Sequence, residues 1–381
     1  MAALINPGRR DILWWTLRLA GLAAFPSSRS ACDAAELPSR LIQEFPKSRL
    51  LAISPTGDKL LVEDWDLPTY PFRVVDTVSG KTKFQGHLHS RVLDASFYSG
   101  GQSIFLRGLV SVGPMSERQQ VSIDLENGNQ TERVFKQDDV DRDDSYLPLH
   151  DQILLAAHRE RQPYRTEFLS LVNANSYQEI QRVPYATRTR APHPTVGGVA
   201  LSTELSHVSL SDDRRYLAYS FDDVIVFRQA TDLRVVWSTV VEAGLRARYL
   251  AVSADGSFVA SANSDNADSR LERRFSVTVY AGQSGKEVAR LALSGTAGLA
   301  LRPDGAVIAV SVNTRLADGS VIPGVGIHEV PSGRKLTSVT HDEVRSGKLQ
   351  ALDSVITPAF TADGQYLVTA GMSTRVWRIR L

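Results

Sequence analysis

One repeated sequence motif decides the fold of this chain, and its clearest copies are YLAVSADGSFVAS (249–261), GLALRPDGAVIAV (298–310) and TPAFTADGQYLVT (357–369). Each copy is an apolar run, a turn that contains Asp-Gly, and a second apolar run. Asp-Gly between two apolar runs indicates a β-hairpin, because the tight turn needs a positive φ that glycine adopts without steric cost. The runs are rich in Val, Ile, Leu and Ala and too short for helices, so each copy predicts two antiparallel strands.

Weaker copies extend the pattern towards the N-terminus. They are LLAISPTGDKLLV (50–62), DASFYSGGQSIFL (94–106), YLPLHDQILLAA (146–157) and HVSLSDDRRYLAY (207–219). A second repeated motif follows each of the first six copies. It consists of an apolar strand, a turn such as Ser-Gly, and a mixed strand, as in VTVYAGQSGKEVARL (277–291). Each unit of about fifty residues therefore holds two hairpins and four antiparallel strands, which indicates a β-propeller blade.

The two ends of the repeat array complement each other. The last unit ends in RVWRIRL (375–381), one strand short, while SRLIQEF (39–45) is an alternating run without a hairpin partner of its own. If the run at 39–45 pairs beside 375–381, it completes the last blade and removes an exposed sheet edge. The sequence therefore predicts an all-β fold, a single domain over residues 36–381: a seven-bladed β-propeller of four-stranded antiparallel blades, closed by an N-terminal strand.

These residues resemble the WD-repeat and YVTN-type β-propeller superfamily, which includes quinoprotein amine dehydrogenase-like propellers. Gln85-Gly86-His87, Val92 and Phe97-Tyr98-Ser99-Gly100-Gly101 follow the WD-repeat opening of Gly-His, apolar strand and turn. The repeats are degenerate, because no strand ends in Trp-Asp and the nearest match is Trp377-Arg378. The resemblance covers about residues 39–381. It implies the propeller fold and a structural role for His87, and it leaves the function open.

The first 35 residues form a separate segment with the layout of an export signal. Arg9-Arg10 precedes an apolar stretch at 12–25, and small residues follow at 27–35. The arginine pair also loosely resembles a twin-arginine signal. A disordered or mis-started leader and a lipid anchor on Cys32 are the alternatives. We expect a periplasmic or secreted protein if the signal is real and a cytoplasmic one otherwise, with no membrane span in the mature domain.

Composition excludes several classes of site. The chain has 43 Lys+Arg and 42 Asp+Glu, so its net charge of +1 gives no reason to expect nucleic acid as a partner. A single cysteine excludes an internal disulfide framework and a Cys-based zinc or iron–sulfur site. Asp139-x-Asp141-x-Asp143 opens like a calcium loop, but Asp144 follows where that loop requires glycine. Without HExxH, GxSxG or P-loop motifs, we expect no catalytic residue, no metal and no cofactor.

The long segments of the repeats are all expected on one face. With the strands of a blade lettered a to d from the axis outward, the a–b and c–d turns are short and lie at one end. The long segments are b–c loops or blade connections, which lie at the other end, here called the long-loop face. They span residues 63–71, 107–119, 136–145, 157–166, 184–205, 263–274, 313–323 and 340–354.

The long-loop face is the predicted binding surface, because function usually lies on loops that a rigid scaffold supports. Neutral lengthening of these loops is the alternative. Acidic stretches at 63–66 and 138–144 and basic stretches at 159–165 and 188–190 are expected side by side on this face, with solvated loops as the alternative. Aromatic and arginine side chains dominate interface energetics. The candidate contact residues are Trp65, Tyr70, Tyr164, Arg165, Tyr185, Arg188 and Arg190.

We therefore expect a non-enzymatic, monomeric interaction scaffold that binds a protein or peptide. One alternative is a propeller enzyme like the quinoprotein dehydrogenases or lactonases. Such enzymes gather metal or cofactor ligands around the central channel, and the chain has no evident convergent set of Glu, Asn and Asp. The other alternative is an accessory envelope propeller of the TolB type.

Overall fold

The computed structural model describes residues 39–64, 71–88, 92–112, 115–135, 145–150, 153–159, 166–174, 176, 178–185, 208–221, 223–264, 275–293, 298–315, 321–341, 357–371 and 373–380. One compact unit spans Leu37–Leu381. The predicted export signal at 1–35 lies outside the described residues.

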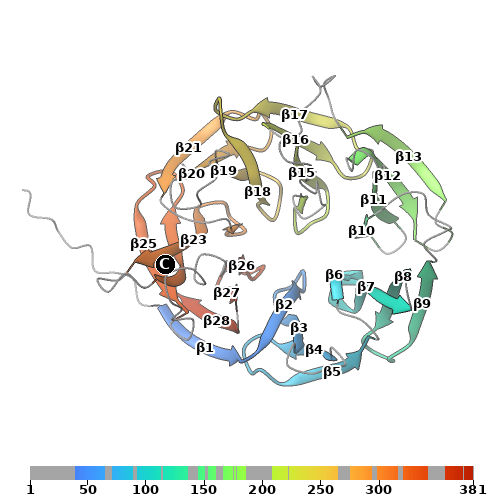
Figure 1. Ribbon diagram of the computed structural model, residues 1–381. Coiled ribbons are helices and arrows are strands. Elements are labelled where there is room, and N and C mark those ends of the chain that lie inside the picture. The colour runs from blue at the N-terminus through green and yellow to red at the C-terminus, as the bar shows by residue number, and fades with distance from the viewer. Residues whose placement is uncertain are drawn as a thin grey trace, which may run out of the picture. The chain divides into compact units, whose positions relative to one another are not determined.

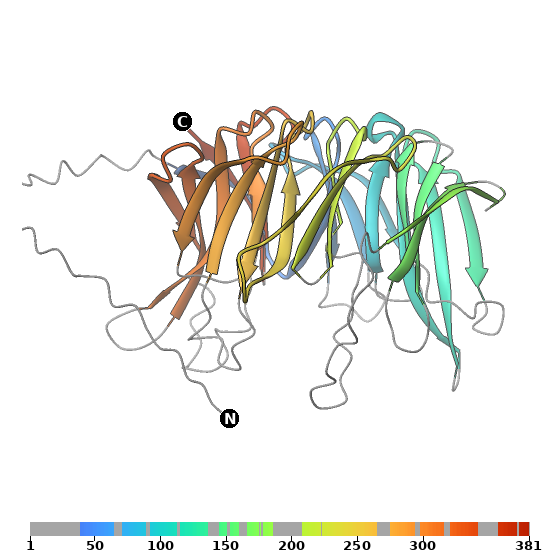
Figure 2. The same ribbon diagram turned by 90° about the horizontal axis from the view of Figure 1, so that it is seen from above.

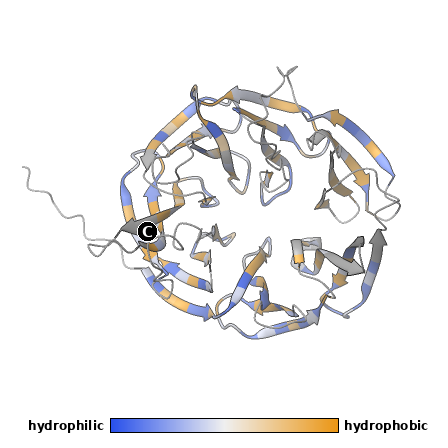
Figure 3. Cartoon of the chain, viewed as in Figure 1, coloured by the Kyte–Doolittle hydropathy of each residue, from blue (hydrophilic) through white to orange (hydrophobic). Residues whose placement is uncertain are grey.

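Strands β1 to β28 form seven antiparallel sheets of four strands each. The sheets stand around a central axis as the blades of a ring, as Figure 1 shows. The predicted fold, an all-β propeller with seven four-stranded blades, is confirmed. Hydrophobic and hydrophilic residues alternate along many of the strands (Figure 3), as expected for sheets that bury one set of side chains.

The first three blades follow one another along the chain. Blade 1 contains β2 (Ser48–Ile53), β3 (Lys59–Asp64), β4 (Pro71–Asp76) and β5 (Thr82–His87). Blade 2 contains β6 (Val92–Tyr98), β7 (Ser103–Val112), β8 (Met115–Asp124) and β9 (Gln130–Phe135), with a short 3-10 turn η1 (Ser99–Gly101) between β6 and β7. Blade 3 contains β10 (Ser145–His150), β11 (Ile153–Arg159), β12 (Thr166–Asn173) and β13 (Glu179–Pro184).

Blades 4 to 6 repeat this order. Blade 4 contains β14 (Ser209–Leu210), β15 (Tyr216–Phe221), β16 (Val224–Gln229) and β17 (Val235–Val240). Blade 5 contains β18 (Arg246–Val252), β19 (Phe258–Ser264), β20 (Phe275–Ala281) and β21 (Glu287–Leu293). Blade 6 contains β22 (Leu299–Leu301), β23 (Val307–Arg315), β24 (Val321–Glu329) and β25 (Lys335–Thr340).

Blade 7 joins the two ends of the repeat array, as the sequence predicted. It contains β26 (Thr357–Phe360), β27 (Tyr366–Ala370), β28 (Thr374–Ile379) and, as its outermost strand, β1 (Ser39–Phe45). The β1–β28 register runs from Ser39 opposite Ile379 to Phe45 opposite Thr374. The Thr374 hydroxyl then donates a hydrogen bond of 2.9 Å to the Ser48 carbonyl and so joins blade 7 to blade 1.

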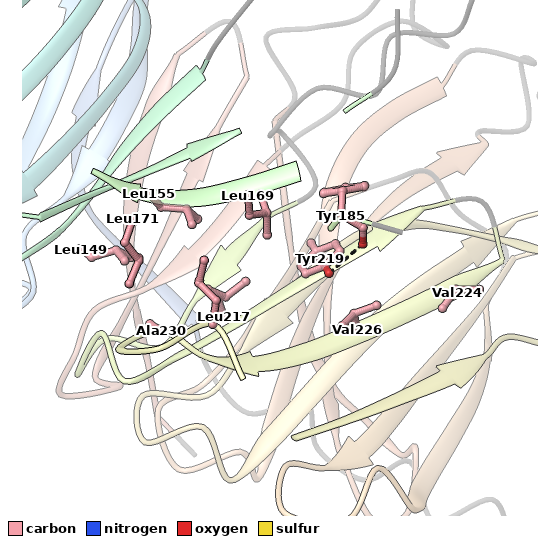
Figure 4. Close-up of a cluster of buried hydrophobic side chains, with 11 residues drawn as sticks. Leu149, Leu155, Leu169, Leu171, Tyr185, Leu217, Tyr219, Val224, Val226 and Ala230 are labelled. Atoms are coloured by element: carbon pink, nitrogen blue, oxygen red, sulfur yellow. Dashed lines mark hydrogen bonds between the residues drawn. The ribbon is translucent and has the colours of Figure 1, made fainter. Parts of the chain in front are cut away.

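The hydrophobic core is divided among the spaces between neighbouring blades. Figure 4 shows the cluster between blades 3 and 4, where Leu155 and Leu169 face Leu217 and Tyr219. Each fully buried side chain of this size stabilises the fold by about 1.5–3 kcal/mol. Because each blade packs against its two neighbours, closing the ring gives the first and last blades the same burial as the others.

Two of the segments that the sequence assigned to long loops contain long hairpins. In blade 2, β7 and β8 run for 10 residues each and pair through to Val112 opposite Met115. In blade 6, β23 and β24 run for 9 residues each and pair through to Arg315 opposite Val321. β-Branched residues continue the strand pattern through both segments, and Asp318-Gly319 is a hairpin signal that the repeat comparison did not use.

Candidate functional site

The two ends of the ring differ in what they present. Figure 2 shows the short turns gathered along one edge of the ring, and the β7–β8 and β23–β24 hairpins extend towards the opposite edge. The first end is here called the turn face. The second is the long-loop face, because the b–c ends of the strands and the connections between blades lie there.

On the turn face, a Ser/Thr-x-Asp-Gly sequence closes the a–b turns of blades 5 and 7 with hydrogen bonds inside each turn. In blade 5 the Ser253 hydroxyl donates to Asp255 at 3.1 Å, and the backbone N–H groups of Ser257 and Phe258 donate to Asp255 and Ser253 at 2.9 Å each. Blade 7 repeats these bonds with Thr361 and Asp363. The recurring aspartates therefore have a structural role as turn residues, as the sequence indicated.

Blade 4 departs from this pattern, because Arg214 occupies the glycine position of its turn. Arg214 has a φ of +58°, and its guanidinium extends to blades 3 and 2. It donates to the Pro148 carbonyl on β10 and to the Phe97 carbonyl on β6, the latter at 2.9 Å. Burial lowers the pKa of Arg214, and the nearby Asp212 opposes that shift. The arginine fastens three neighbouring blades together at the turn face.

At the long-loop face, buried polar side chains join successive blades. Glu63, at the end of β3, is 1% exposed; it accepts 2.8 Å and 2.7 Å hydrogen bonds from the Val92 N–H of blade 2 and from Arg49. Asp64 accepts two hydrogen bonds from Arg73, at 2.9 and 2.7 Å. Glu63 and Asp64 belong to the acidic stretch predicted at 63–66. Both of their carboxylates therefore form hydrogen bonds within the fold.

Between blades 3 and 4, two tyrosines and an arginine form the connecting hydrogen bonds. The Tyr219 hydroxyl donates to the Tyr185 carbonyl at 2.9 Å (Figure 4). The Tyr185 hydroxyl donates to the Ser220 carbonyl, also at 2.9 Å. Arg228 donates to the Tyr219 oxygen at 2.9 Å and to the Pro184 carbonyl at 3.2 Å. Burial raises the pKa of Tyr219, while Arg228 partly offsets that shift.

Between blades 6 and 7, His341 is fully buried directly after β25. Its Nε2 lies 2.8 Å from the Thr369 hydroxyl, and that same hydroxyl accepts a 2.8 Å hydrogen bond from the Trp377 indole. His87, which the resemblance marked as the structural histidine, is instead exposed at the end of β5. The expectation for His87 is therefore corrected: the buried histidine is His341, whose partner Thr369 also bonds the Trp377 indole.

The structure describes one of the seven candidate contact residues. Tyr185 is 5% exposed and belongs to the core between blades 3 and 4, so its side chain packs rather than projects. A Tyr that directly follows a strand is a packing residue as readily as a contact residue, and sequence alone did not separate the two roles. Outside the described residues lie Trp65, Tyr70, Tyr164, Arg165, Arg188 and Arg190.

The described residues contain no group of three or more His, Cys, Asp or Glu side chains that could hold a metal ion. The candidate calcium loop at 139–144 lies outside the described residues. The same part of the chain contains no helix long and apolar enough to span a membrane.

Comparison with known proteins gives a fold likeness. No family model and no curated protein sequence matches the chain. Among solved structures, a similar one is the β-propeller domain of Cps50 (Swd1) from Myceliophteria thermophila, with a TM-score of 0.55 at 10% identity. The match covers 90% of this chain and 100% of that domain. At this identity the likeness supports the propeller fold, and the finer WD-repeat or YVTN assignment stays a prediction.

Proposed function

We propose that this protein is a non-enzymatic interaction scaffold that binds a protein or peptide through its long-loop face. The observation that carries the proposal is the set of buried ties at the roots of that face. Glu63, Tyr185 and His341 each fix the point where one blade passes to the next. The loops of this face therefore start from positions that are held in place, which is how a rigid scaffold supports a binding surface.

The propeller fold supports the proposal, because it resembles a WD40 scaffold domain. The turn face offers less for recognition, since its aspartates are used in hydrogen bonds within their own turns. The mechanism is complementarity of shape and charge, with little rearrangement of the ring.

Affinity capture with the full chain, followed by cross-linking, tests the proposal. The triple variant Trp65→Ala/Tyr164→Ala/Arg188→Ala should lose the captured partner, because aromatic and arginine side chains carry most interface energy. The matched control replaces three exposed outer-strand or turn side chains: Lys83→Ala/Lys286→Ala/Arg334→Ala. Equal capture by both triple variants would contradict the proposal.

The non-enzymatic part has a separate test. We expect elemental analysis for calcium and an absorbance scan of the purified full chain to show neither a bound metal nor a chromophore. A stoichiometric metal or a visible chromophore would favour the dehydrogenase-like or lactonase-like alternative.

Export also belongs to the proposal, because residues 9–35 have the order basic, apolar, small. Mass spectrometry of the protein isolated from its source should find a mature N-terminus near residues 31–35. An intact Met1 would contradict export, and a lipid on Cys32 would identify the anchored alternative.

A further inference from the structure

The outermost strand of each blade has one edge that its own sheet leaves unpaired. These seven strands are β1, β5, β9, β13, β17, β21 and β25, the terminal members of the seven sheets. An open edge attracts another strand, and proteins usually protect it with charged side chains. The charge on each outer strand therefore indicates which edges are protected.

Strand β17, with the sequence VVWSTV, is the exception among these outer strands. The other six carry at least one Lys, Arg, Asp or Glu, whereas β17 carries none. Its residues are mostly β-branched, and Val235 and Val240 are 37% and 43% exposed. This edge combines high strand propensity with exposed apolar side chains and lacks the charged side chains of the other outer strands, although it keeps a β-bulge between Val235 and Trp237.

The backbone of β17 is held in a fixed orientation. The Trp237 indole donates a 2.7 Å hydrogen bond to the Gly282 carbonyl of blade 5. The Val241 N–H donates inward to the Asp223 carbonyl at 2.8 Å. Because successive residues of a strand direct their N–H and C=O groups to opposite edges, those of Ser238 and Val240 face the open edge.

We infer that β17 is a self-association edge that pairs antiparallel with β17 of a second copy of this chain, about a two-fold axis at Ser238. The two Ser238 residues then lie opposite each other and exchange backbone hydrogen bonds. Because a β-bulge lies between Val235 and Trp237, Val235 then lies opposite Val240 of the second copy. Such β-branched pairs across strands are favourable.

Charge complementarity at the strand ends selects the second copy as the occupant. Arg234 directly precedes β17, and Glu242 lies two residues after it. The bulge shifts the register by one residue, so an antiparallel pair centred on Ser238 brings Arg234 of each copy next to Glu242 of the other. One self-complementary segment thus supplies two ion pairs, which is the arrangement that a two-fold interface requires.

Within one copy these two charges have replaceable partners. Arg234 lies 3.9 Å from Asp232 and donates a 2.9 Å hydrogen bond to Gln229, and Glu242 lies 2.8 Å from Arg290. The four charged side chains are 45–65% exposed, and such surface pairs contribute little. Exchanging these partners for the opposite charge of the second copy therefore costs little free energy.

The resulting dimer is a weak one. An interface built on one 6-residue strand is smaller than those of tight complexes, so monomer and dimer exchange and the dimer grows with concentration. The sequence predicts a monomer. The inferred dimer replaces that prediction, because the folded blade places the uncharged strand at an open edge. The inference goes beyond the proposed function and does not depend on it.

Sedimentation velocity of the full chain over a concentration series is the primary test. Wild type should show a monomer–dimer equilibrium, and amide hydrogen exchange at 235–240 should slow as concentration rises. Ser238→Lys places two like charges against each other at the two-fold axis and should weaken the dimer by roughly tenfold or more. Thr82→Lys, at an exposed position on the outer strand β5, is the matched control and should leave the dimer unchanged.

A charge exchange tests the register. Arg234→Glu and Glu242→Arg should each weaken the dimer, by roughly threefold to tenfold, and the double variant should restore it. A wild type that stays monomeric at every concentration, or a dimer that Ser238→Lys leaves intact, would overturn the inference. Protection of 235–240 that is independent of concentration and is lost on deletion of residues 1–36 would assign the edge to the chain's own leader, and would also overturn it.

Discussion

The seam between blades 7 and 1 and the seam between blades 3 and 4 are built from different bonds. The first depends on backbone pairing of β1 with β28 inside blade 7, which holds Phe45 in a cluster with Val368 of blade 7 and Leu60 of blade 1. The second depends on side chains that reach neighbouring backbone, chiefly Tyr219 and Arg228.

The difference lies in what each seam tolerates. A backbone ladder with apolar side chains accepts many sequences, provided that the alternation and length are kept. The seam between blades 3 and 4 needs particular donors and acceptors, because Arg228 is 5% exposed and the bonds described for it go to carbonyls and a phenol. A buried charge of this kind is stable only while each of its partners is present.

Deleting residues 39–45 should have the largest effect. The deletion opens the edge of β28 and removes Phe45, a side chain whose loss alone costs about 3–5 kcal/mol. Since a domain of this kind has a net stability of about 5–15 kcal/mol, we expect loss of cooperative folding and aggregation. Circular dichroism during thermal unfolding, with gel filtration, measures both. Deletion of residues 1–36 is the control and should leave the unfolding transition in place.

Tyr219→Phe should have the next largest effect. The change leaves the Arg228 Nε–H without its acceptor and the Tyr185 carbonyl without its donor, at a cost of about 2–3 kcal/mol. Urea unfolding measures the loss. Arg228→Met and the double variant complete a cycle, and the double variant should cost less than the sum of the two single changes. Strict additivity would show that these residues do not act as a unit.

Thr369→Val tests the seam between blades 6 and 7, where the bonds described run between side chains. Valine keeps the volume and removes the hydroxyl that lies between His341 and Trp377. We expect a loss of about 1–2 kcal/mol in urea unfolding, because the buried His341 and the half-buried Trp377 lose one shared partner. Thr357→Val, at an exposed position on β26, should be neutral. Equal stability of the two variants would argue against the tie.

The smallest expected effect is a loss of stability at alkaline pH, caused by ionisation of Tyr219 at the seam between blades 3 and 4. Burial raises the pKa of Tyr219 above its usual value of 10.0, although Arg228 opposes the shift. A raised pKa in the folded state means that the contribution is complete below pH 10.0 and is lost as pH rises from there through the folded pKa. The free energy of unfolding should therefore fall above about pH 10 in wild type and less steeply in Tyr219→Phe. Parallel pH profiles would contradict this assignment.

The sequence predicted the seven blades and the closing strand because both are periodic or alternating features. Asp-Gly turns and apolar runs report local backbone geometry, and SRLIQEF (39–45) left one strand to be matched with the last blade. The partners of Arg228 could not be predicted in this way, since the Pro184 carbonyl is 44 residues away and carries no side-chain signal.

The same limit explains the misplaced histidine. His87 follows a glycine and so matched a local sequence pattern. The role of His341 is visible only in the folded ring, where Thr369 bonds both His341 and Trp377. The same limit applies to the candidate contact residues. Burial of Tyr185 depends on how blades 3 and 4 meet, and single-sequence reasoning does not reach that arrangement.

Native-state hydrogen exchange across residues 39–45 tests the central claim, that the first strand of the ring is a full member of its last blade. The account predicts that the hydrogen-bonded amides of β1 exchange as slowly as those of β28 and become exposed in the same cooperative unfolding event. Fast exchange of β1, with β26 to β28 still protected, would contradict the closed ring and the scaffold built on it.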